Sequence, residues 1–385
     1  MRTVLVTGLG GAGRTTVAAA TALAAAREGE RVLLLSADPD PGESLSLARD
    51  AGVRAERIDS GAHFRSELLT LQERGTAALE LLGASRLDEE ELTELPGAAQ
   101  FALLHALRTA DSDAWDLAVV DLPPVQEALA VLALPEQLRR YLRRLLPPER
   151  QAARALRPML AQLAGVPMPA QWLYETTARW ERELAAVQAR IDDPGTVVRL
   201  VAEPGPAATR ALRTARTGIA LHRHALDLVV ANRLVPGGSG EPWLAALAAE
   251  QQEHLKELSA CFGGIDVAEL PHLGRAPRTA GELFPLELPA TPRTAAPQWH
   301  IEDRLADDGV LVWQLPLPGA VKAELGLIRR GDELLLTAGP FRRTVTLPSV
   351  LRRCTVEGAG LTDGVLGIRF VPDPALWPRE QRPDR

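Results

Sequence analysis

A run of glycine and hydroxyl residues near the N-terminus has the composition of a phosphate-binding loop. Residues 8–16 read Gly-Leu-Gly-Gly-Ala-Gly-Arg-Thr-Thr and follow an apolar run at 3–7. Glycines let successive backbone N–H groups turn inward, and the first turn of a following helix adds positive potential, so such a loop binds anions. In this position Arg14 could contact a phosphate and the Thr15 hydroxyl could ligate Mg²⁺. The residues therefore predict a phosphate site between a strand and a helix beginning at Thr15.

The elements that would position this loop are short apolar runs alternating with longer helical stretches. Most of these runs are apolar on both faces, as strands of a parallel sheet covered by helices on both sides should be. We therefore expect an α/β fold with a mostly parallel sheet. The expected strands are residues 3–7, 31–36, 117–121, 196–201, 226–232 and 265–270.

Two segments between strands are longer than a crossover requires, and we expect each to be a helical insert within a nucleotide-binding domain spanning 1–285. They cover about 60–110 and 134–192 and are rich in Leu, Ala, Arg and Glu. Prolines interrupt the second segment, which favours three short helices. Its Trp and Leu stripe is compatible with an ordinary helix core and with a groove for an apolar partner, because both place apolar residues at helical spacing.

The composition changes near residue 285, where prolines and small polar residues become frequent. We expect a linker over 286–308, a small antiparallel β-sandwich over 309–372 and a charged, proline-rich tail over 373–385. The sandwich is indicated by short, partly alternating runs separated by Gly-Asp, Gly-Pro and Asp-Gly turns. These runs are residues 310–315, 324–329, 333–338, 341–347 and 365–370.

Composition and charge exclude several classes of protein. The 385 residues carry 43 Lys and Arg against 50 Asp and Glu, a net charge of -7, so a nucleic-acid partner is not expected. No apolar run approaches the roughly 20 residues that span a bilayer. Cys261 and Cys354 are too few for a disulfide framework and lack the spacing of a zinc site. The first residues do not form a secretory signal, so we expect a cytoplasmic protein.

Five segments, in order and spacing, resemble one family. The loop at 8–16 resembles the deviant Walker A motif Gly-Lys-Gly-Gly-Val-Gly-Lys-Thr-Thr of the ArsA and tail-anchored-protein-targeting ATPases. Residues 36–39 and 115–124 resemble that family's switch I and switch II. Residues 132–136 read Leu-Ala-Leu-Pro-Glu, as at the start of the family's client-binding insert, and 231–236 resemble its Asn-Arg-Val-Leu-Pro motif. The C-terminal segment resembles the small heat-shock (α-crystallin) domain that some ArsA-like proteins carry.

The resemblance implies ATP and Mg²⁺ as cofactors, a homodimer, and a hydrophobic or membrane-protein client at the second insert. It implies that Thr15 and Asp121 act on the metal, and that Asp38 and Arg14 serve hydrolysis, Asp38 by orienting the attacking water. It also implies a set of nucleotide contacts, in which Asn232 reads the adenine. These are Gly10, Gly11, Ala12, Gly13, Arg14, Thr15, Thr16, Asn232 and Arg233.

The chain departs from the family at both lysines of the motif, which are replaced by Leu9 and Arg14. Switch II also lacks the family's Thr-Gly-His, because Pro124 is followed by Val-Gln-Glu. Charge that develops during phosphoryl transfer would lose two lysine donors, so we expect weak or absent hydrolysis. Two hypotheses remain: an ATP-dependent dimeric switch or chaperone for apolar clients, and a pseudo-ATPase scaffold. We interpret His222 and His224, outside the motifs, as surface or cap residues.

Overall fold

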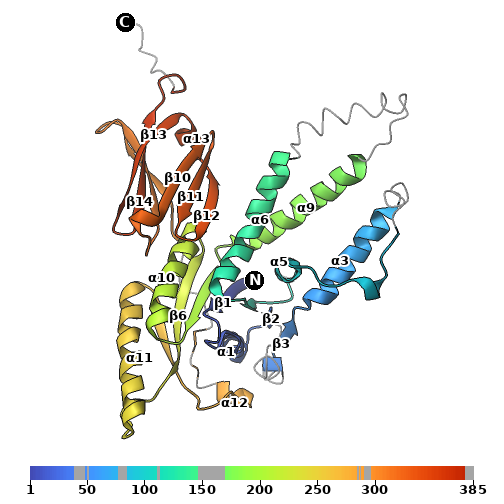
Figure 1. Ribbon diagram of the computed structural model, residues 1–385, viewed down its shortest axis with the longest axis vertical. Coiled ribbons are helices and arrows are strands. Elements are labelled where there is room, and N and C mark those ends of the chain that lie inside the picture. The colour runs from blue at the N-terminus through green and yellow to red at the C-terminus, as the bar shows by residue number, and fades with distance from the viewer. Residues whose placement is uncertain are drawn as a thin grey trace. The chain divides into compact units, whose positions relative to one another are not determined.

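The computed structural model describes residues 1–38, 48–49, 52–76, 85–110, 113–145, 170–283, 286, 288–289 and 296–377, with the side chains of 170–175 excepted (Figure 1). These residues form two compact units. The first comprises Met1–Thr196 and Leu273–Pro292, and the second comprises Val197–His272 and Arg293–Arg385. None of the helices within these ranges is long and apolar enough to cross a membrane.

A seven-stranded sheet with the order β3-β2-β4-β1-β5-β6-β7 confirms the predicted α/β architecture. The neighbouring strands whose register is defined all run parallel. Its strands are β1 (Arg2–Gly8), β2 (Val32–Ser36), β3 (Arg54–Arg57), β4 (Leu117–Asp121), β5 (Thr196–Ala202), β6 (Ala225–Leu234) and β7 (Asp266–Pro271). Every residue of β2, β4 and β5 is buried, which explains why these strands are mostly apolar on both faces.

Helices connect these strands and form the inserts between them. Those of the first unit are α1 (Arg14–Arg27), α3 (Ser60–Arg74), η1 (Glu89–Glu91), α5 (Ala98–Thr109), α6 (Val125–Leu145), α9 (Ala170–Ile191) and α12 (Ala280–Leu283). Those of the second unit outside its β-sandwich are α10 (Pro206–Leu221) and α11 (Pro242–Cys261). Helices α3 and α5 fall within the first predicted insert, and α9 with most of α6 within the second.

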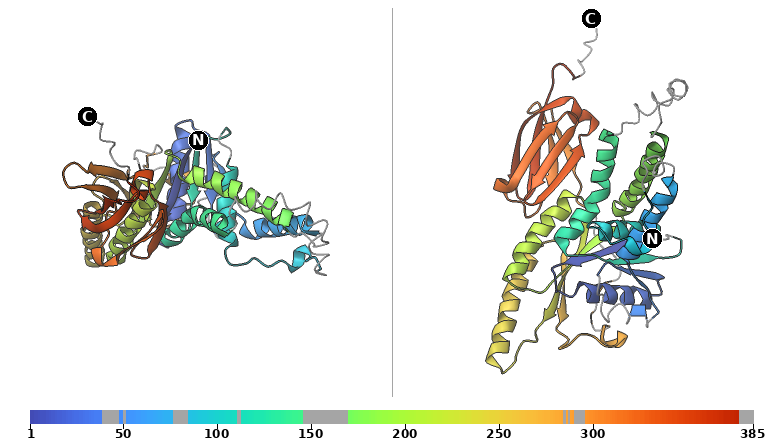
Figure 2. Two further views of the ribbon diagram at one scale, coloured as in Figure 1. Left: turned by 90° about the horizontal axis from the view of Figure 1, so that it is seen from above. Right: turned by 45° about the vertical axis from the view of Figure 1, so that its right-hand side comes forward.

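The second insert contains two long helices where we expected short ones. Helices α6 and α9 lie side by side (Figures 1 and 2). Arg139 and Arg143 of α6 form ion pairs with Glu181 of α9, at 3.2 and 2.7 Å. The five prolines expected to separate short helices, at 147, 148, 158, 167 and 169, lie outside the described residues.

The C-terminal segment forms the expected small antiparallel β-sandwich. One sheet contains β10 (Leu325–Arg330), β11 (Glu333–Ala338) and β12 (Phe341–Thr346). The other has the order β13-β14-β9-β8 and contains β8 (His300–Arg304), β9 (Val310–Pro316), β13 (Cys354–Thr362) and β14 (Val365–Pro372). Short helices η2 (Lys322–Glu324) and α13 (Ser349–Arg352) complete it. Strand β8 lies within the segment expected to be a linker and pairs antiparallel with β9.

Within the second unit, the sandwich packs against helix α10. The Thr217 hydroxyl donates to the backbone oxygen of Pro318 at 2.9 Å. Arg343 of β12 donates through Nη1 to the backbone oxygen of Leu221, the last residue of α10, at 3.0 Å. These bonds satisfy one carbonyl at the end of α10 and one in the loop after β9.

The same junction buries His222 and His224, so the expectation of surface residues was wrong. Each is 6% exposed, and their rings stack with centroids 6.1 Å apart. His222 is the C-cap of α10, so the expectation of a cap residue holds for this histidine. Burial, followed by the charges of His224 and Arg343, lowers the pKa of His222 to about 3. Burial and the Arg343 charge lower the pKa of His224 to about 4. Both rings are therefore neutral at neutral pH.

Candidate functional site

The glycine loop connects the end of β1 to the start of α1, as predicted. Gly11 and Gly13 have φ angles of 75° and 87°, and Gly13 is the N-cap of α1. Such angles strain other residues, which explains glycine at these positions. A Cβ built on Gly10 or Gly11 would meet no atom within 4 Å. The loop therefore has an open face above the N-terminus of a 14-residue helix.

Two hydroxyl groups converge on the carboxylate at the end of β4. Thr15 Oγ1 of α1 and Ser36 Oγ of β2 each lie 2.8 Å from Asp121 Oδ2. Strand β4 lies between β1 and β2, so their carboxyl ends meet at one edge of the sheet. The parallel topology therefore brings Thr15 to Asp121, the two residues expected to act on a metal.

Asp121 is a buried carboxylate in which one oxygen atom has no hydrogen-bond partner among the described residues. Its side chain is fully buried, and burial raises its pKa, against the lowering effects of its hydrogen bonds with Thr15 and Ser36. Within the part of the chain that the structure describes, its Oδ1 atom has no hydrogen-bond partner. A buried, unpartnered carboxylate oxygen is costly, so this atom is suited to a cation or to a water on a cation.

Arg14 lies beside this carboxylate and is itself hydrogen-bonded. Its Nη1 donates to the backbone oxygen of Leu122, directly after β4. The Thr7 hydroxyl donates to the backbone oxygen of Pro123 at 2.7 Å, and Leu122 N donates to Val6 O at 2.8 Å. The end of the switch II segment, after β4, is thus bonded to β1 and to the residue in the P-loop lysine position.

Asp38 follows β2 at the same edge of the sheet. It is half-buried, its backbone N–H donates to Ser36 Oγ at 3.2 Å, and its charge raises the pKa of Asp121. The first unit thus brings Arg14, Thr15, Asp38 and Asp121 together. The switch I residues after Asp38, from 39 to 47, lie outside the described residues.

Asn232 and Arg233 belong to the second unit, at the end of β6. Asn232 is 6% exposed, whereas Arg233 is exposed, has a φ of 61° and pairs with Glu203 at 3.6 Å. The pairing register of β6 with β7 shifts at this point. Gln251 of α11 bridges the irregularity by donating to Arg233 O at 3.2 Å and accepting from Val235 N at 2.8 Å.

Sequence reasoning did not single out Ser36 and Gln251. Ser36 is buried and contacts Asp121, a contact that depends on β2 lying beside β4. A hydroxyl at the end of an apolar strand was the available signal. Gln251 is 4% exposed in the middle of α11, and an amide within an otherwise apolar helix face was the corresponding signal.

Two family models match this chain. The ArsA model, described as anion-transporting ATPase, matches residues 1–278. The model of an HSP20-like domain found in ArsA matches residues 308–370. The first match covers more than half of the chain and includes the whole glycine loop, and the second covers most of the β-sandwich.

Several relatives are similar to this chain over nearly its whole length. An uncharacterized protein of Streptomyces coelicolor is 56% identical over 391 residues, covering 98% of this chain and 100% of that protein. A Mycobacterium tuberculosis protein is 29% identical over 418 residues, covering 98% and 97%. An Aquifex aeolicus protein, named as a candidate arsenical pump-driving ATPase, is 25% identical over 393 residues, covering 93% and 97%. This chain belongs to the ArsA family of anion-transporting ATPases and carries the family's HSP20-like domain at its C-terminal end.

Proposed function

We propose that this protein binds Mg-ATP at the loop of residues 8–16, hydrolyses it slowly at most, and uses it to control a cytoplasmic homodimer that handles apolar clients. The observation that carries the proposal is the buried Asp121 carboxylate beside Thr15, below an open glycine loop. A calorimetric titration with ATP and ADP, paired with a turnover assay, tests it. Absence of binding at millimolar nucleotide would contradict it.

Magnesium fits the residues at this site. It prefers oxygen ligands and retains several waters, and it is usually held by one or two carboxylates together with substrate phosphates. The Thr15 hydroxyl would be a direct ligand, and Asp121 would hold the ion or its water shell through the unpartnered Oδ1. When bound, the ion would neutralise charge on the β- and γ-phosphates. Gly11, Gly13 and the first turn of α1 would supply backbone N–H groups to the same phosphates.

Slow hydrolysis is proposed because the cationic groups differ from the family motif. Leu9, in the position of the signature lysine, cannot donate a hydrogen bond to phosphate. Arg14 retains a positive charge, but its planar fork differs from a compact ammonium and donates to Leu122 O. An interaction made only in the transition state is worth several kcal/mol of barrier. Losing such an interaction would slow turnover while leaving ground-state binding largely intact.

Client binding is proposed at the pair of helices α6 and α9. Leu145 of α6 is 77% exposed, Tyr141 is 50% exposed and Trp180 of α9 is 44% exposed. These side chains would have been buried in an ordinary helix core. Exposed apolar surface of this kind favours an interaction site for apolar segments. The sandwich offers a competing location, since Ile328 of β10 is 52% exposed.

A pseudo-ATPase scaffold is the second candidate function. The bond from Arg14 to Leu122 O ties the loop cation to switch II. The residue after Pro124 is Val125, which is buried and begins α6, where the family's motif continues Thr-Gly-His. A switch II fixed by these contacts would respond little to nucleotide. Equal dimerisation with ATP, with ADP and without nucleotide would favour the scaffold.

A further inference from the structure

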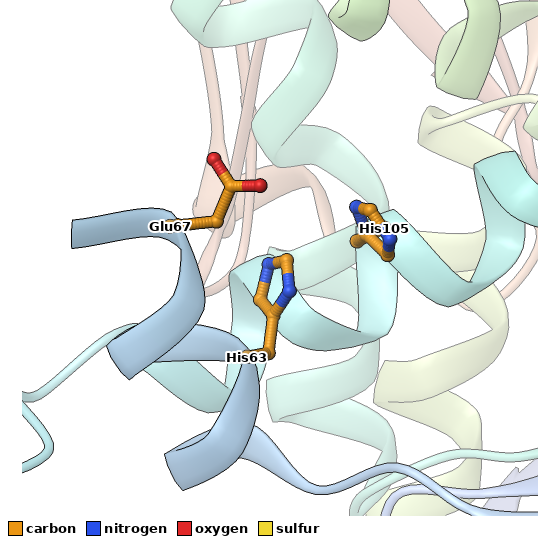
Figure 3. Close-up of side chains that lie close together, drawn as sticks. All are labelled: His63, Glu67 and His105. Carbon is orange, nitrogen blue, oxygen red and sulfur yellow. The ribbon is translucent and has the colours of Figure 1, made fainter. Parts of the chain in front are cut away.

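A cluster of three metal-ligand side chains lies on helices α3 and α5, apart from the nucleotide loop. His63 and Glu67 are four residues apart on α3, and His105 is on α5 (Figure 3). One ligand atom from each residue lies within 4.8 Å of the other two. The two imidazole rings are 4.5 Å apart between centroids, at an interplanar angle of 43°. Figure 3 shows the His63 ring between the Glu67 carboxylate and the His105 ring.

We propose that His63, Glu67 and His105 form a binding site for a transition-metal dication, of which Zn²⁺ fits best. Imidazole nitrogens and a carboxylate suit zinc and its neighbours, whereas magnesium and calcium prefer oxygen ligands alone. Two histidines and one carboxylate leave a fourth, tetrahedral position for water. The site is distinct from the Mg²⁺ position assigned to Thr15 and Asp121, and it stands whether or not the protein binds ATP.

The helices hold these side chains in nearly the required places. Residues four apart on a helix have neighbouring side chains, so His63 and Glu67 share one face of α3. The start of α3 is fixed by its N-cap, since Asp59 accepts hydrogen bonds from Ala62 N at 2.8 Å and His63 N at 3.1 Å. Zinc bonds of about 2.0–2.1 Å place tetrahedral ligands about 3.3 Å apart. Side-chain rotation alone could close the remaining gap.

One positively charged side chain, Arg108, lies beside the cluster and would repel a bound cation. Arg108 Nη2 lies 3.2 Å from His105 Nδ1. A metal at Nδ1 would replace this contact, and a metal at Nε2 would put the ring proton on Nδ1, so Arg108 must turn away in either case. Glu67 supplies a negative charge, and Glu183 of α9 acts on His105 in the same direction. Burial, followed by the charges of His63 and Arg108, lowers the pKa of His105.

A bound ion would link two helices of the first insert. Helix α5 packs against both α3 and α9, so a metal bridge from α3 to His105 would extend a continuous set of contacts toward the proposed client-binding helices. Metal binding by the folded protein adds stability by mass action. The ion would therefore stiffen the insert, and its removal would loosen α3.

The test uses the full chain, stripped with a chelator and titrated with Zn²⁺ in a calorimeter. Millimolar Mg²⁺ is present throughout, to occupy the Thr15 and Asp121 site. We expect one site per chain, with affinity at least tenfold weaker in His63→Ala and in His105→Ala. His254→Ala is the matched control, because His254 forms a similar same-helix pair with Glu257 on α11. It should leave zinc binding unchanged.

A second variant distinguishes a specific effect on the zinc site from misfolding of the protein. Arg108→Gln removes the cation beside His105 and should tighten zinc binding at least threefold, which damage to the fold would not produce. Zinc should also raise the melting temperature of the wild type and leave that of His63→Ala unchanged. Equal affinity in the wild type, His63→Ala and His105→Ala, loss of binding in His254→Ala, or no change in Arg108→Gln would overturn the proposal.

Discussion

The Arg14 side chain donates a hydrogen bond to the backbone oxygen of Leu122. Arg14 occupies the P-loop lysine position, and Leu122 follows Asp121 at the end of β4. The cation of the loop thus contacts the switch II segment.

Restoring both lysines should raise turnover. We expect the Leu9→Lys, Arg14→Lys double variant to hydrolyse ATP at least about tenfold faster than the wild type, because a transition-state donor is worth several kcal/mol. The measurement is steady-state release of phosphate with saturating Mg-ATP. Adding Asp38→Asn should remove the gain. A fast wild-type rate that collapses in Arg14→Lys would show that Arg14 is an adapted catalytic residue.

Replacing Asp121 should stabilise the free protein while weakening its response to Mg-ATP. Burial raises the pKa of Asp121, so the ionised form is disfavoured in the fold, and stability falls as pH rises through the folded pKa. Asp121→Asn removes this cost at neutral pH and should add about 1–3 kcal/mol, a few degrees of melting temperature. Thermal unfolding with and without Mg-ATP provides both measurements.

Asp116→Asn is the matched control for this variant. Asp116 directly precedes β4, pairs with Arg31 at 2.9 Å, and has a pKa lowered to about 2, chiefly by the Arg31 hydrogen bonds. Asp116→Asn should not stabilise the protein, and Mg-ATP should still raise its melting temperature. A lower melting temperature for Asp121→Asn, or an unchanged Mg-ATP response, would contradict the assignment.

The buried pair His222 and His224 predicts a loss of stability in mild acid. His222 and His224 have folded pKa values of about 3 and about 4, against about 6.5 in the unfolded chain. The unfolded state therefore binds more protons between these values, and stability falls as pH drops below about 6.5. Between pH 7 and pH 5 each histidine should cost about 2 kcal/mol of stability, because its ring stays neutral in the fold.

Denaturant unfolding at these two pH values measures the effect. His222→Gln and His224→Gln should each reduce the pH dependence, whereas the exposed His300→Gln should leave it unchanged. Arg343 also faces the pair, and its charge contributes to lowering both histidine pKa values. An unaltered pH slope in both buried variants would disprove the explanation.

One charge substitution in each candidate location can assign client binding either to helices α6 and α9 or to the β-sandwich. An apolar helical peptide should shift the Trp180 fluorescence of the wild type and bind at least about tenfold more weakly to Leu145→Asp, since a charge in an apolar contact is costly. Ile328→Asp on β10 is the control, with a side chain that is 52% exposed. Weak binding by Ile328→Asp with normal binding by Leu145→Asp would transfer the function to the sandwich.

The sequence predicted the parallel sheet well because its central strands are buried on both faces. All six expected strands are present, with ends within two residues or so of those expected. Strand β3 was missed, since Arg54–Arg57 is mostly charged and lies at the edge of the sheet. Strands β8 and β13 were missed as well, because β8 is polar and β13 contains two glycines. Such strands form through pairing with a neighbour, which local sequence does not reveal.

The candidate site was predictable where a motif fixes the local structure. The loop, Thr15 and the strand-end Asp121 could be found because a glycine loop between a strand and a helix has few conformations. The Ser36 contact and the Arg14 contact with Leu122 could not, because they depend on which strands become neighbours. The burial of His222 and His224 depends on the sandwich packing against α10, and nothing near these residues in sequence indicates it.

Nucleotide binding at the loop of residues 8–16 is tested by a calorimetric titration of the full chain with Mg-ATP, compared with Thr15→Ala and Gly13→Val. We expect the wild type to bind, Thr15→Ala to lose the magnesium-dependent part of the affinity, and Gly13→Val to lose binding, because Gly13 has a φ of 87° and caps α1. Absence of wild-type binding at millimolar Mg-ATP, or equal affinity in all three proteins, would contradict nucleotide binding at this loop.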